Sequence, residues 1–187
     1  MTIGSVGFGQ DQYSAMGVGT VSNPTSDAVS ISVNFAAYNK AGKVLDTESG
    51  AYVILRASSS QIVAQDLSVP DGAKIARIDA QVSVDDSSKD EHPESSMTIA
   101  AVDVLKKYDM YSATGKIDSK YQDTVSNVYV GISCTNKAGN IVGGGYSFMD
   151  GNVVGGSQAP FSASITVSER PAKCDASATL SNLSEAK

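Results

Sequence analysis

Residue types that carry catalytic or recognition chemistry are scarce in this chain. Its 187 residues include no Trp, a single His and two Cys. One His leaves little room for a His-based metal site or a Ser-His-Asp triad, and the absence of Trp removes the largest aromatic face on which a sugar ring could stack. We therefore expect no cofactor and no His-based catalysis.

Positive charge and long apolar runs are scarce as well. Lys and Arg number 14 against 20 Asp and Glu, which gives a formal net charge of −6. Nucleic acids and anionic membrane surfaces are bound through basic patches, so we expect no nucleic-acid partner. The longest uninterrupted apolar run, Ala51 to Leu55, is far shorter than the roughly 18 residues that a transmembrane helix needs. The sequence therefore predicts no transmembrane segment.

Small, β-branched and turn-forming residues are abundant instead. The chain is 41% hydrophobic, contains 17 Gly and is rich in Ser and Val. This apolar content is too high for a disordered chain, and Glu, Lys and Leu are too few for a coiled coil. The composition indicates an all-β protein.

The chain contains an internal repeat. The tetrapeptide Asn-Lys-Ala-Gly occurs at residues 39–42 and again, 97 positions later, at residues 136–139. Further collinear matches at spacings of 96 to 98 include Thr2 with Thr98, Ile3 with Ile99, Val6 with Val102, Gly19 with Gly115 and Asp27 with Asp123. Such a series predicts a tandem duplication.

Each unit has the pattern of β-strands. Apolar residues alternate with polar or small ones in four segments, which is typical of strands with one buried face. The inward-facing positions expected from this alternation are Ile31, Val33, Phe35, Ala37, Ala76, Ile78, Ala80, Val82, Val84, Val128, Val130, Ile132, Cys134, Phe161, Ala163, Ile165 and Val167. Each Asn-Lys-Ala-Gly lies between two strands, where Asn and Gly can close a hairpin. Strands of this number bury a core by folding into two packed sheets, so each unit is expected to be a β-sandwich.

We divide the chain into two sandwiches, a linker and a tail. The first sandwich covers residues 1–84 and the second residues 98–180, with an acidic linker at 85–97 and a tail at 181–187. The linker has a net charge of −4 and no apolar residue before Met97. We therefore expect a flexible coil and limited contact between two semi-independent sandwiches. The alternative architecture is one larger sandwich in which strands from both repeats are intermixed.

One motif of the first unit resembles that of a known protein family. Residues 35–39 read Phe-Ala-Ala-Tyr-Asn, and Ala-Gly-Lys-Val follows at residues 41–44. This segment resembles the FxLYD family of bacterial exported proteins and lipoproteins, with Ala37 and Asn39 in place of the Leu and Asp of the family pattern. Shorter similarities to the family lie at residues 19–23, 115–119, 132–136 and 145–161.

The resemblance implies an immunoglobulin-like sandwich in each unit, an extracellular or cell-envelope location and no known catalytic activity. It supplies no site residues. The N-terminal residues lack the charged and apolar regions of a signal peptide. We therefore expect that the signal or lipobox segment of an exported protein is not part of this sequence and that Met1 is an added start.

Both cysteines lie in the second unit, at positions that we expect to face inward. Their counterparts in the first unit are Ala37 and Ile78, an apolar pair that could touch across the core. A disulfide between Cys134 and Cys174 fits this placement and an exported protein. The alternative is two buried free thiols, which are common apolar fillers.

The acidic linker is the one stretch with metal-binding potential. Its carboxylates could supply the oxygen ligands of Ca²⁺, but it has no Asp-x-Asp-x-Asn-Gly loop, and a solvated linker is the simpler interpretation. The residues concerned are Asp85, Asp86, Asp90, Glu91 and Glu94. His92, the only imidazole, lies in the same hydrophilic stretch and is expected to titrate in solvent rather than to catalyse.

Three other features have an ordinary and a functional interpretation. Residues 143–145 and 155–156 are glycines without the Gly-Lys-Ser/Thr of a phosphate-binding loop, so we interpret them as bulges and turns. Several tyrosines could form an exposed aromatic face for protein or glycan contact, or could be singly exposed on strands. These are Tyr38, Tyr52, Tyr129 and Tyr146. A pair of carboxylates that includes Asp150 could form a glycosidase site.

Together these observations predict a non-catalytic binding or spacer module of a bacterial cell-envelope or secreted protein. We expect a monomer whose ligand is an unknown protein or a cell-wall glycan. One alternative is a structural or adhesive subunit that assembles with copies of itself through exposed strand edges. The other is a carboxylate-based hydrolase.

Overall fold

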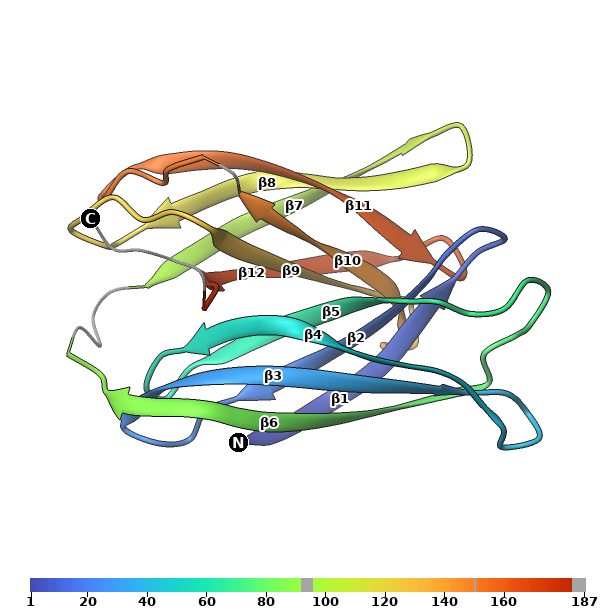
Figure 1. Ribbon diagram of the computed structural model, residues 1–187. Helices are drawn as coiled ribbons and strands as arrows, with labels where there is room; N and C mark the ends of the chain where they lie inside the picture. Colours follow the sequence, from blue (N-terminus) through green and yellow to red (C-terminus); the bar gives the residue numbers. More distant parts are fainter. Residues whose placement is uncertain (92–95, 150, 183–187) are drawn as a thin grey trace.

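The computed structural model describes residues 1–91, 96–149 and 151–182, which form antiparallel strands without a helix (Figure 1). The first half of the chain contains β1 (Thr2–Gln10), β2 (Ala15–Ser22), β3 (Asp27–Tyr38), β4 (Val44–Leu55), β5 (Ser60–Leu67) and β6 (Arg77–Lys89). The second half contains β7 (Met97–Lys107), β8 (Met110–Ser119), β9 (Val128–Thr135), β10 (Ile141–Met149), β11 (Gln158–Val167) and β12 (Lys173–Leu180). The predicted all-β class is confirmed. Over the described ranges there is also no helix of the length and apolarity that crossing a membrane requires.

The two halves repeat one strand order. The first half forms the sheets β1-β2-β5 and β4-β3-β6, and the second half forms one six-stranded sheet in the order β12-β9-β10-β11-β8-β7. In that sheet β10 and β11 are joined by only two residue pairs, Gly143 with Val167 and Gly144 with Thr166. Apart from this junction, the second half has the order of the first, β7-β8-β11 and β10-β9-β12. Each of these sheets takes its strands from one half of the chain, so the intermixed alternative is not what the described residues form.

The two Asn-Lys-Ala-Gly segments close equivalent hairpins, as predicted. Asn39 donates its backbone N–H to the Lys43 carbonyl at 3.0 Å, and Asn136 does the same to Asn140 at 3.0 Å. In both turns the Asn side-chain oxygen accepts two further backbone N–H groups. Gly42 has a φ of 79° and the equivalent Gly139 a φ of 82°, a left-handed conformation that favours glycine.

The alternation of apolar residues correctly predicts most of the core. The inward positions of β3 and β9 are fully buried, and those of β11 are buried as well. The exception is β6, where Ile78 is buried but Val84 is 56% exposed. Since β6 is the outer strand of its sheet, its far end lies at an uncovered edge, so alternation there does not lead to burial.

The predicted linker is wrong over much of its length. β6 continues to Lys89 by pairing with β3, with Asp86 opposite Ser30 and Lys89 opposite Asp27. Asp90 is then buried at 7% exposure, forms an ion pair with Arg56 at 2.5 Å and accepts the backbone N–H of Ala57 at 2.9 Å. A ladder of backbone hydrogen bonds and a buried ion pair need no apolar side chain, which is why an all-polar segment still docks on the first half.

The predicted tail also begins too early. Ser181 is fully buried and forms an antiparallel bridge with Val53 of β4. The backbone N–H of Asn182 donates to the carbonyl of Tyr52 at 3.3 Å. The end of β12 is therefore held by the first half of the chain, and only residues 183–187 of the predicted tail lie outside the described part.

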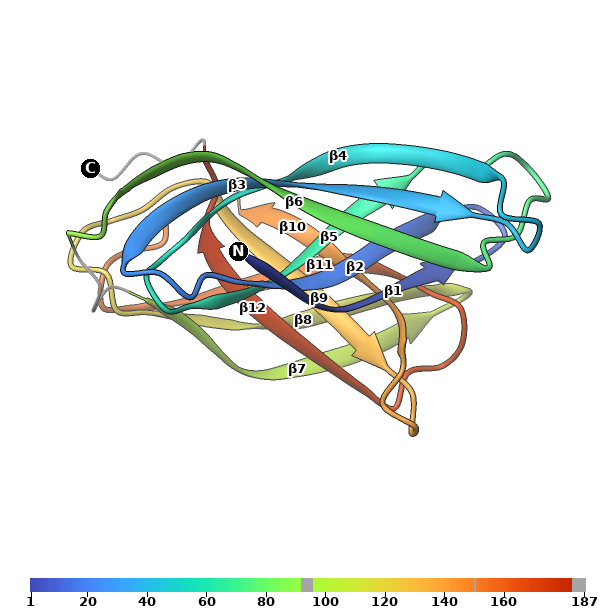
Figure 2. The same cartoon turned by 90° about the horizontal axis from the view of Figure 1, so that it is seen from below.

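The two halves pack face to face, contrary to the expectation of limited contact. The sheet β1-β2-β5 lies against the strands β10, β9 and β12, and Figure 2 shows that β9 and β12 run obliquely to β1 and β2. Met16 and Val18 of β2 are buried in this interface with Ile141 and Tyr146 packed against them. The halves thus behave as one packed body.

Candidate functional site

A turn between β1 and β2 forms one wall of a hollow at the end of the first half. Asp11 organises this turn, because its Oδ1 accepts the backbone N–H groups of Tyr13 at 2.7 Å and of Ser14 at 2.8 Å. The Ser14 hydroxyl lies 3.0 Å from the Thr166 hydroxyl of β11. The turn is thereby fixed both by its own side chain and by the second half of the chain.

The loop from β5 to β6 forms the opposite wall. Within it, Ala73 donates its N–H to the Pro70 carbonyl at 2.9 Å, and Gly72 takes a φ of 75°. The side chain of Gln10 clamps the loop to β1, since its Nε2 donates to the Ala73 carbonyl at 2.7 Å and its Oε1 accepts the Ile75 N–H at 3.0 Å. This loop is therefore held in place although it has no regular secondary structure.

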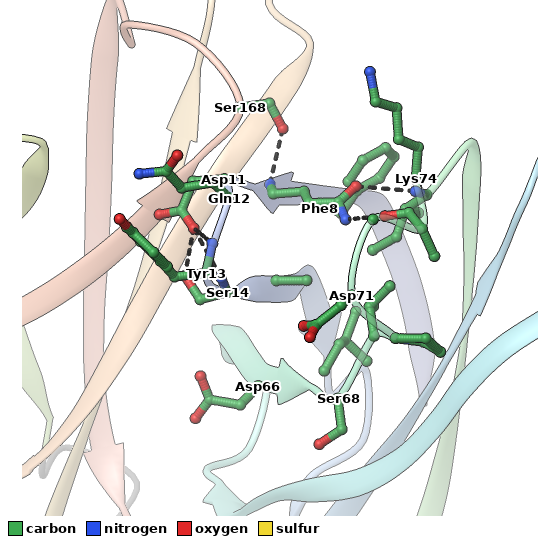
Figure 3. Close-up of a pocket in the computed structure, with 18 residues that line it drawn as sticks. Phe8, Asp11, Gln12, Tyr13, Ser14, Asp66, Ser68, Asp71, Lys74 and Ser168 are labelled. Atoms are coloured by element: carbon green, nitrogen blue, oxygen red, sulfur yellow. Dashed lines mark hydrogen bonds between the residues drawn. The ribbon is translucent and has the colours of Figure 1, made fainter.

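Between these walls lies a hollow of about 920 Å³, shown in Figure 3. Its apolar lining consists of Phe8, Ala15, Leu67, Val69, Pro70, Ala73 and Ile75. Three carboxylates, Asp11, Asp66 and Asp71, also line it, against the single cation of Lys74. Figure 3 shows the side chain of Asp71 directed into the hollow, whereas that of Lys74 extends away from it. The hollow thus combines an apolar lining with a local excess of negative charge.

An aromatic cluster behind the hollow joins the two halves. Tyr129 of β9 is fully buried. Its ring stacks with that of Tyr146, with 5.9 Å between the ring centres, and meets the ring of Phe148 edge-on, with 5.3 Å between the centres. The Tyr129 hydroxyl donates to the Ala64 carbonyl at 3.1 Å and accepts the Ala64 N–H at 2.8 Å. The Tyr146 hydroxyl donates to Oδ2 of Asp66 at 2.9 Å. One carboxylate of the hollow is therefore held by the second half of the chain.

Burial changes the ionisation of these tyrosines. Burial, followed by the hydrogen bond and charge of Asp66, raises the pKa of Tyr146 to about 12. Complete burial raises the pKa of Tyr129 further, although the Ala64 backbone opposes this shift. Burial also raises the pKa of Tyr121, with the Arg56 guanidinium lowering it and Asp90 raising it. At neutral pH the hydroxyls of Tyr129 and Tyr146 therefore remain protonated and able to donate.

The predicted disulfide between Cys134 and Cys174 is present. The two residues lie directly opposite each other on β9 and β12, so the bond joins neighbouring strands of one sheet. The equivalent residues of the first half, Ala37 and Ile78, are also direct cross-strand partners. The expected pairing is thus correct, but the contact lies within a sheet and does not cross the core.

The acidic residues considered for Ca²⁺ that the structure describes do not form a metal-binding cluster. Asp85 accepts the Ser32 hydroxyl at 3.1 Å on the exposed side of β6, whereas Asp90 is buried with Arg56. In the described part of the chain no three His, Cys, Asp or Glu side chains are placed to hold a metal ion. Glu94, together with His92 and Asp150, lies outside the described residues, so the structure does not test the roles considered for them.

The four tyrosines do not form one exposed face. Tyr52 is 45% exposed, Tyr129 is fully buried, and the partly buried Tyr146 stacks on Tyr129. The guanidinium carbon of Arg77 lies 4.1 Å from the centre of the Tyr38 ring. Alternation places Tyr129 on the outer face of β9, but that face is covered by the first half of the chain. Of the two interpretations left open for these residues, the exposed aromatic face is not formed, because the outer face of β9 is covered and not exposed to solvent.

The glycines of β10 have a second role besides irregular backbone. Gly143 lies at a register shift of the β9–β10 pair, as the interpretation as a bulge requires. A Cβ added to Gly143 would lie 3.0 Å from Cα of Gly9 and 2.0 Å from the carbonyl oxygen of Thr166. A Cβ on Gly131 of β9 would meet the Ile62 carbonyl oxygen of β5 at 1.9 Å. Glycine is needed at these positions because backbones from the two halves approach closely.

The residues of the hollow were not identified from the sequence as a site. Their local signals are turn signals only: Asp11 four residues before the next strand, and Pro70, Asp71 and Gly72 between two strands. Such signals predict where the chain turns, but they do not indicate that two turns from different hairpins border one hollow.

Comparisons with known proteins leave the family open. No family model and no curated protein matches the chain. Among solved structures, the crystal structure of red sea bream transglutaminase is similar with a TM-score of 0.29 and 10% sequence identity. The match covers 93% of this chain and 29% of that chain, so the chain spans less than a third of the structure it matches. A likeness of this degree carries no argument about fold or function, and the FxLYD resemblance stays a prediction.

Proposed function

We propose that this chain is a non-catalytic binding module of a bacterial cell-envelope or secreted protein, built from two immunoglobulin-like sandwiches. The strand order supports the fold assignment. If the strands of the first half are lettered A, B, C, C′, E and F, its sheets read A-B-E and C′-C-F, which is the order of an immunoglobulin-type sandwich without its G strand. The second half supports the same assignment, although its disulfide joins C to F within one sheet and not B to F between sheets.

The location outside the cytoplasm is supported by the disulfide. Bonds between cysteines persist in oxidising compartments and are rare in the cytosol. The Cys134–Cys174 bond therefore indicates an oxidising, extracytoplasmic environment. Anchoring to the envelope is part of the proposal and follows from the family resemblance alone.

The observation that carries the binding role is the hollow between the β1–β2 turn and the β5–β6 loop. Its volume of about 920 Å³ lies within the roughly 300–1,000 Å³ that is usual for ligand sites. An apolar lining with three carboxylates and one Lys favours an occupant that presents apolar side chains beside positive charge. We therefore propose that the ligand is a protein segment with basic and apolar side chains. This narrows the expectation from the sequence, which left the choice between a protein and a cell-wall glycan open.

This proposal is tested by NMR titration of the ¹⁵N-labelled protein with two short peptides. The first is acetyl-Lys-Leu-Lys-Phe-amide, and the second replaces both Lys by Glu. We expect the Lys peptide to shift the amide signals of residues 11–14 and 68–75, and the Glu peptide to shift none of them.

A pair of matched variants shows whether the carboxylates are responsible. The double variant Asp66→Asn/Asp71→Asn should weaken binding of the Lys peptide about tenfold or more. The double variant Asp118→Asn/Asp123→Asn removes the same charge from two exposed positions, one near the end of β8 and one in the connection to β9, that do not line the hollow. It should bind like the unmodified protein. Equal binding of both peptides, or no shifts in the two loops, would contradict the proposed function.

A further inference from the structure

The hairpin of β7 and β8 ends in a projecting tip. The ladder between β8 and β11 ends at Tyr111, which lies opposite Ile165, because Thr166 and Val167 of β11 pair with β10 instead. Residues 107–110 therefore lie beyond the last pair with β11. Figure 1 shows the end of this hairpin, at the upper right, standing apart from the end of β11. Tyr108, at the turn itself, has a φ of 56°, which is uncommon for a bulky residue.

The tip exposes large apolar side chains next to lysines. Leu105 is 57% exposed, Tyr108 is 82% exposed and Met110 is 71% exposed. Lys106 and Lys107 lie between them in the chain, and both are exposed. A cluster of this kind on a soluble surface is typical of an interaction site, and Tyr is among the residues that dominate such sites energetically.

The tip has the chemistry that the hollow requires. The hollow presents an apolar lining under Asp11, Asp66 and Asp71, and the tip presents apolar side chains beside two Lys and one Asp. The local charges are therefore opposite, −2 for the hollow with Lys74 included and +1 for the tip. A chain with a net charge of −6 repels its own copies at long range, so self-association needs a local contact of opposite charge of this kind.

We propose that the β7–β8 tip of one copy of this protein occupies the hollow of a second copy. This inference rests on the binding role proposed above and names its occupant. The tip and the hollow lie at the same end of the molecule, the right-hand end in Figure 1. Two copies related by a two-fold axis can therefore exchange tips reciprocally, which doubles one contact and closes the assembly as a dimer.

The experiment measures self-association by sedimentation velocity up to millimolar protein. The unmodified protein should form a weak dimer, because each contact is small. Tyr108→Gly removes the central side chain while glycine suits the positive φ, so the hairpin stays folded. This variant should associate about tenfold or more weakly.

A charge exchange between the two surfaces gives the decisive test. The tip variant Lys106→Glu/Lys107→Glu and the hollow variant Gln12→Lys/Asp71→Lys should each remain monomeric, because like charges then meet. Both changed hollow positions are exposed, and Asp11 and Asp66, which hold the turn and Tyr146, are retained. When the two variants are mixed, the acidic tip meets the basic hollow, and association should be restored.

Several outcomes would overturn the inference. A protein that stays monomeric at millimolar concentration has no such contact, and association that survives all three variants uses another surface, such as a strand edge. Binding of the unmodified protein to phosphatidylglycerol vesicles without self-association would assign the tip to a membrane instead. If the Lys peptide binds the hollow but the protein does not dimerise, this inference fails while the proposed function stands; if the peptide also fails to bind, both fail.

Discussion

The substitution Tyr129→Phe tests whether the two halves depend on each other for stability. The Tyr129 hydroxyl is the hydrogen-bond partner of both backbone groups of Ala64, at 2.8 Å and 3.1 Å. Ala64 lies on β5, the outer strand of the sheet β1-β2-β5. The hydroxyl therefore takes the place that a neighbouring strand would have at this edge, and it comes from the other half of the chain.

The expected loss of stability follows from the groups left behind. Phe keeps the ring and its stacking on Tyr146 but leaves the N–H and C=O of Ala64 without this partner in a fully buried site. A buried polar group that loses its partner costs about 1–3 kcal/mol. With two such groups we expect the free energy of unfolding to fall by about 2–6 kcal/mol, which corresponds to about 4–24 °C in Tm for a chain of this size.

The assay is urea unfolding followed by far-ultraviolet circular dichroism and by tyrosine fluorescence. The midpoint should fall with an unchanged slope, and the two signals should coincide, because the halves unfold together. Tyr146→Phe is the matched control. It also removes one tyrosine hydroxyl, but the partner Asp66 is exposed and can be solvated, so we expect a loss of about 0.5–1.5 kcal/mol.

Two results would refute this reasoning. A loss below about 0.5 kcal/mol for Tyr129→Phe would mean that the contact between the halves does not hold in solution. Two separate unfolding transitions, with only the second half affected, would restore the picture of semi-independent sandwiches and with it the flexible linker.

Four further predictions concern the disulfide, the tyrosine hydroxyls, the buried carboxylate and the close backbone contact. Cys134→Ala/Cys174→Ala should lower the free energy of unfolding by about 4 kcal/mol, because the bond closes a loop of sequence separation 40; a difference near zero on reduction would contradict it. The free energy of unfolding should be constant up to about pH 10 and fall as pH rises through 12. The pKa of Tyr146 is about 12 in the folded protein and about 10 in the unfolded chain, so the unfolded chain loses the proton first. Tyr146→Phe should make this fall shallower. Asp90→Ala should cost about 3–5 kcal/mol in thermal or urea unfolding, since it removes one partner of a buried ion pair and the acceptor of the Ala57 N–H. An unchanged midpoint would show that the docked segment contributes nothing. Gly131→Ala should cost about 1–3 kcal/mol or more, because its Cβ would lie 1.9 Å from a backbone oxygen of the other half, and a neutral effect would show that the halves are not this close.

Features that depend on residues close together in the sequence were predictable from it. Both Asn-Lys-Ala-Gly hairpins form with the same hydrogen bonds, because Asn39 and Asn136 bind the backbone of their own turns. The strands and most of their inward faces follow from apolar alternation, since successive side chains of a strand point to opposite sides. The disulfide was predictable from the repeat, because Cys134 and Cys174 take the positions of two apolar cross-strand partners in the first half.

The linker shows where local patterns stop being informative. Its composition correctly reports that no apolar side chain is available to dock it, but the ladder that extends β6 to Lys89 needs only backbone groups. The burial of Asp90 requires Arg56, which lies 34 positions earlier in the chain. No sequence window around residues 85–91 contains that partner, so the segment reads as solvated.

The sequence by itself therefore determined the all-β class, the internal repeat, the hairpins and the cysteine pair, while the tertiary structure decided how the two halves are joined and where the hollow lies. Tyr129 illustrates the difference. Alternation correctly places it on the outer face of β9, yet that face is covered, and its hydroxyl completes the edge of β5 in the other half. The physical reason is that periodicity along a strand fixes which side a residue faces, whereas burial and binding depend on what packs against that side, and here the covering residues lie about 65 positions away.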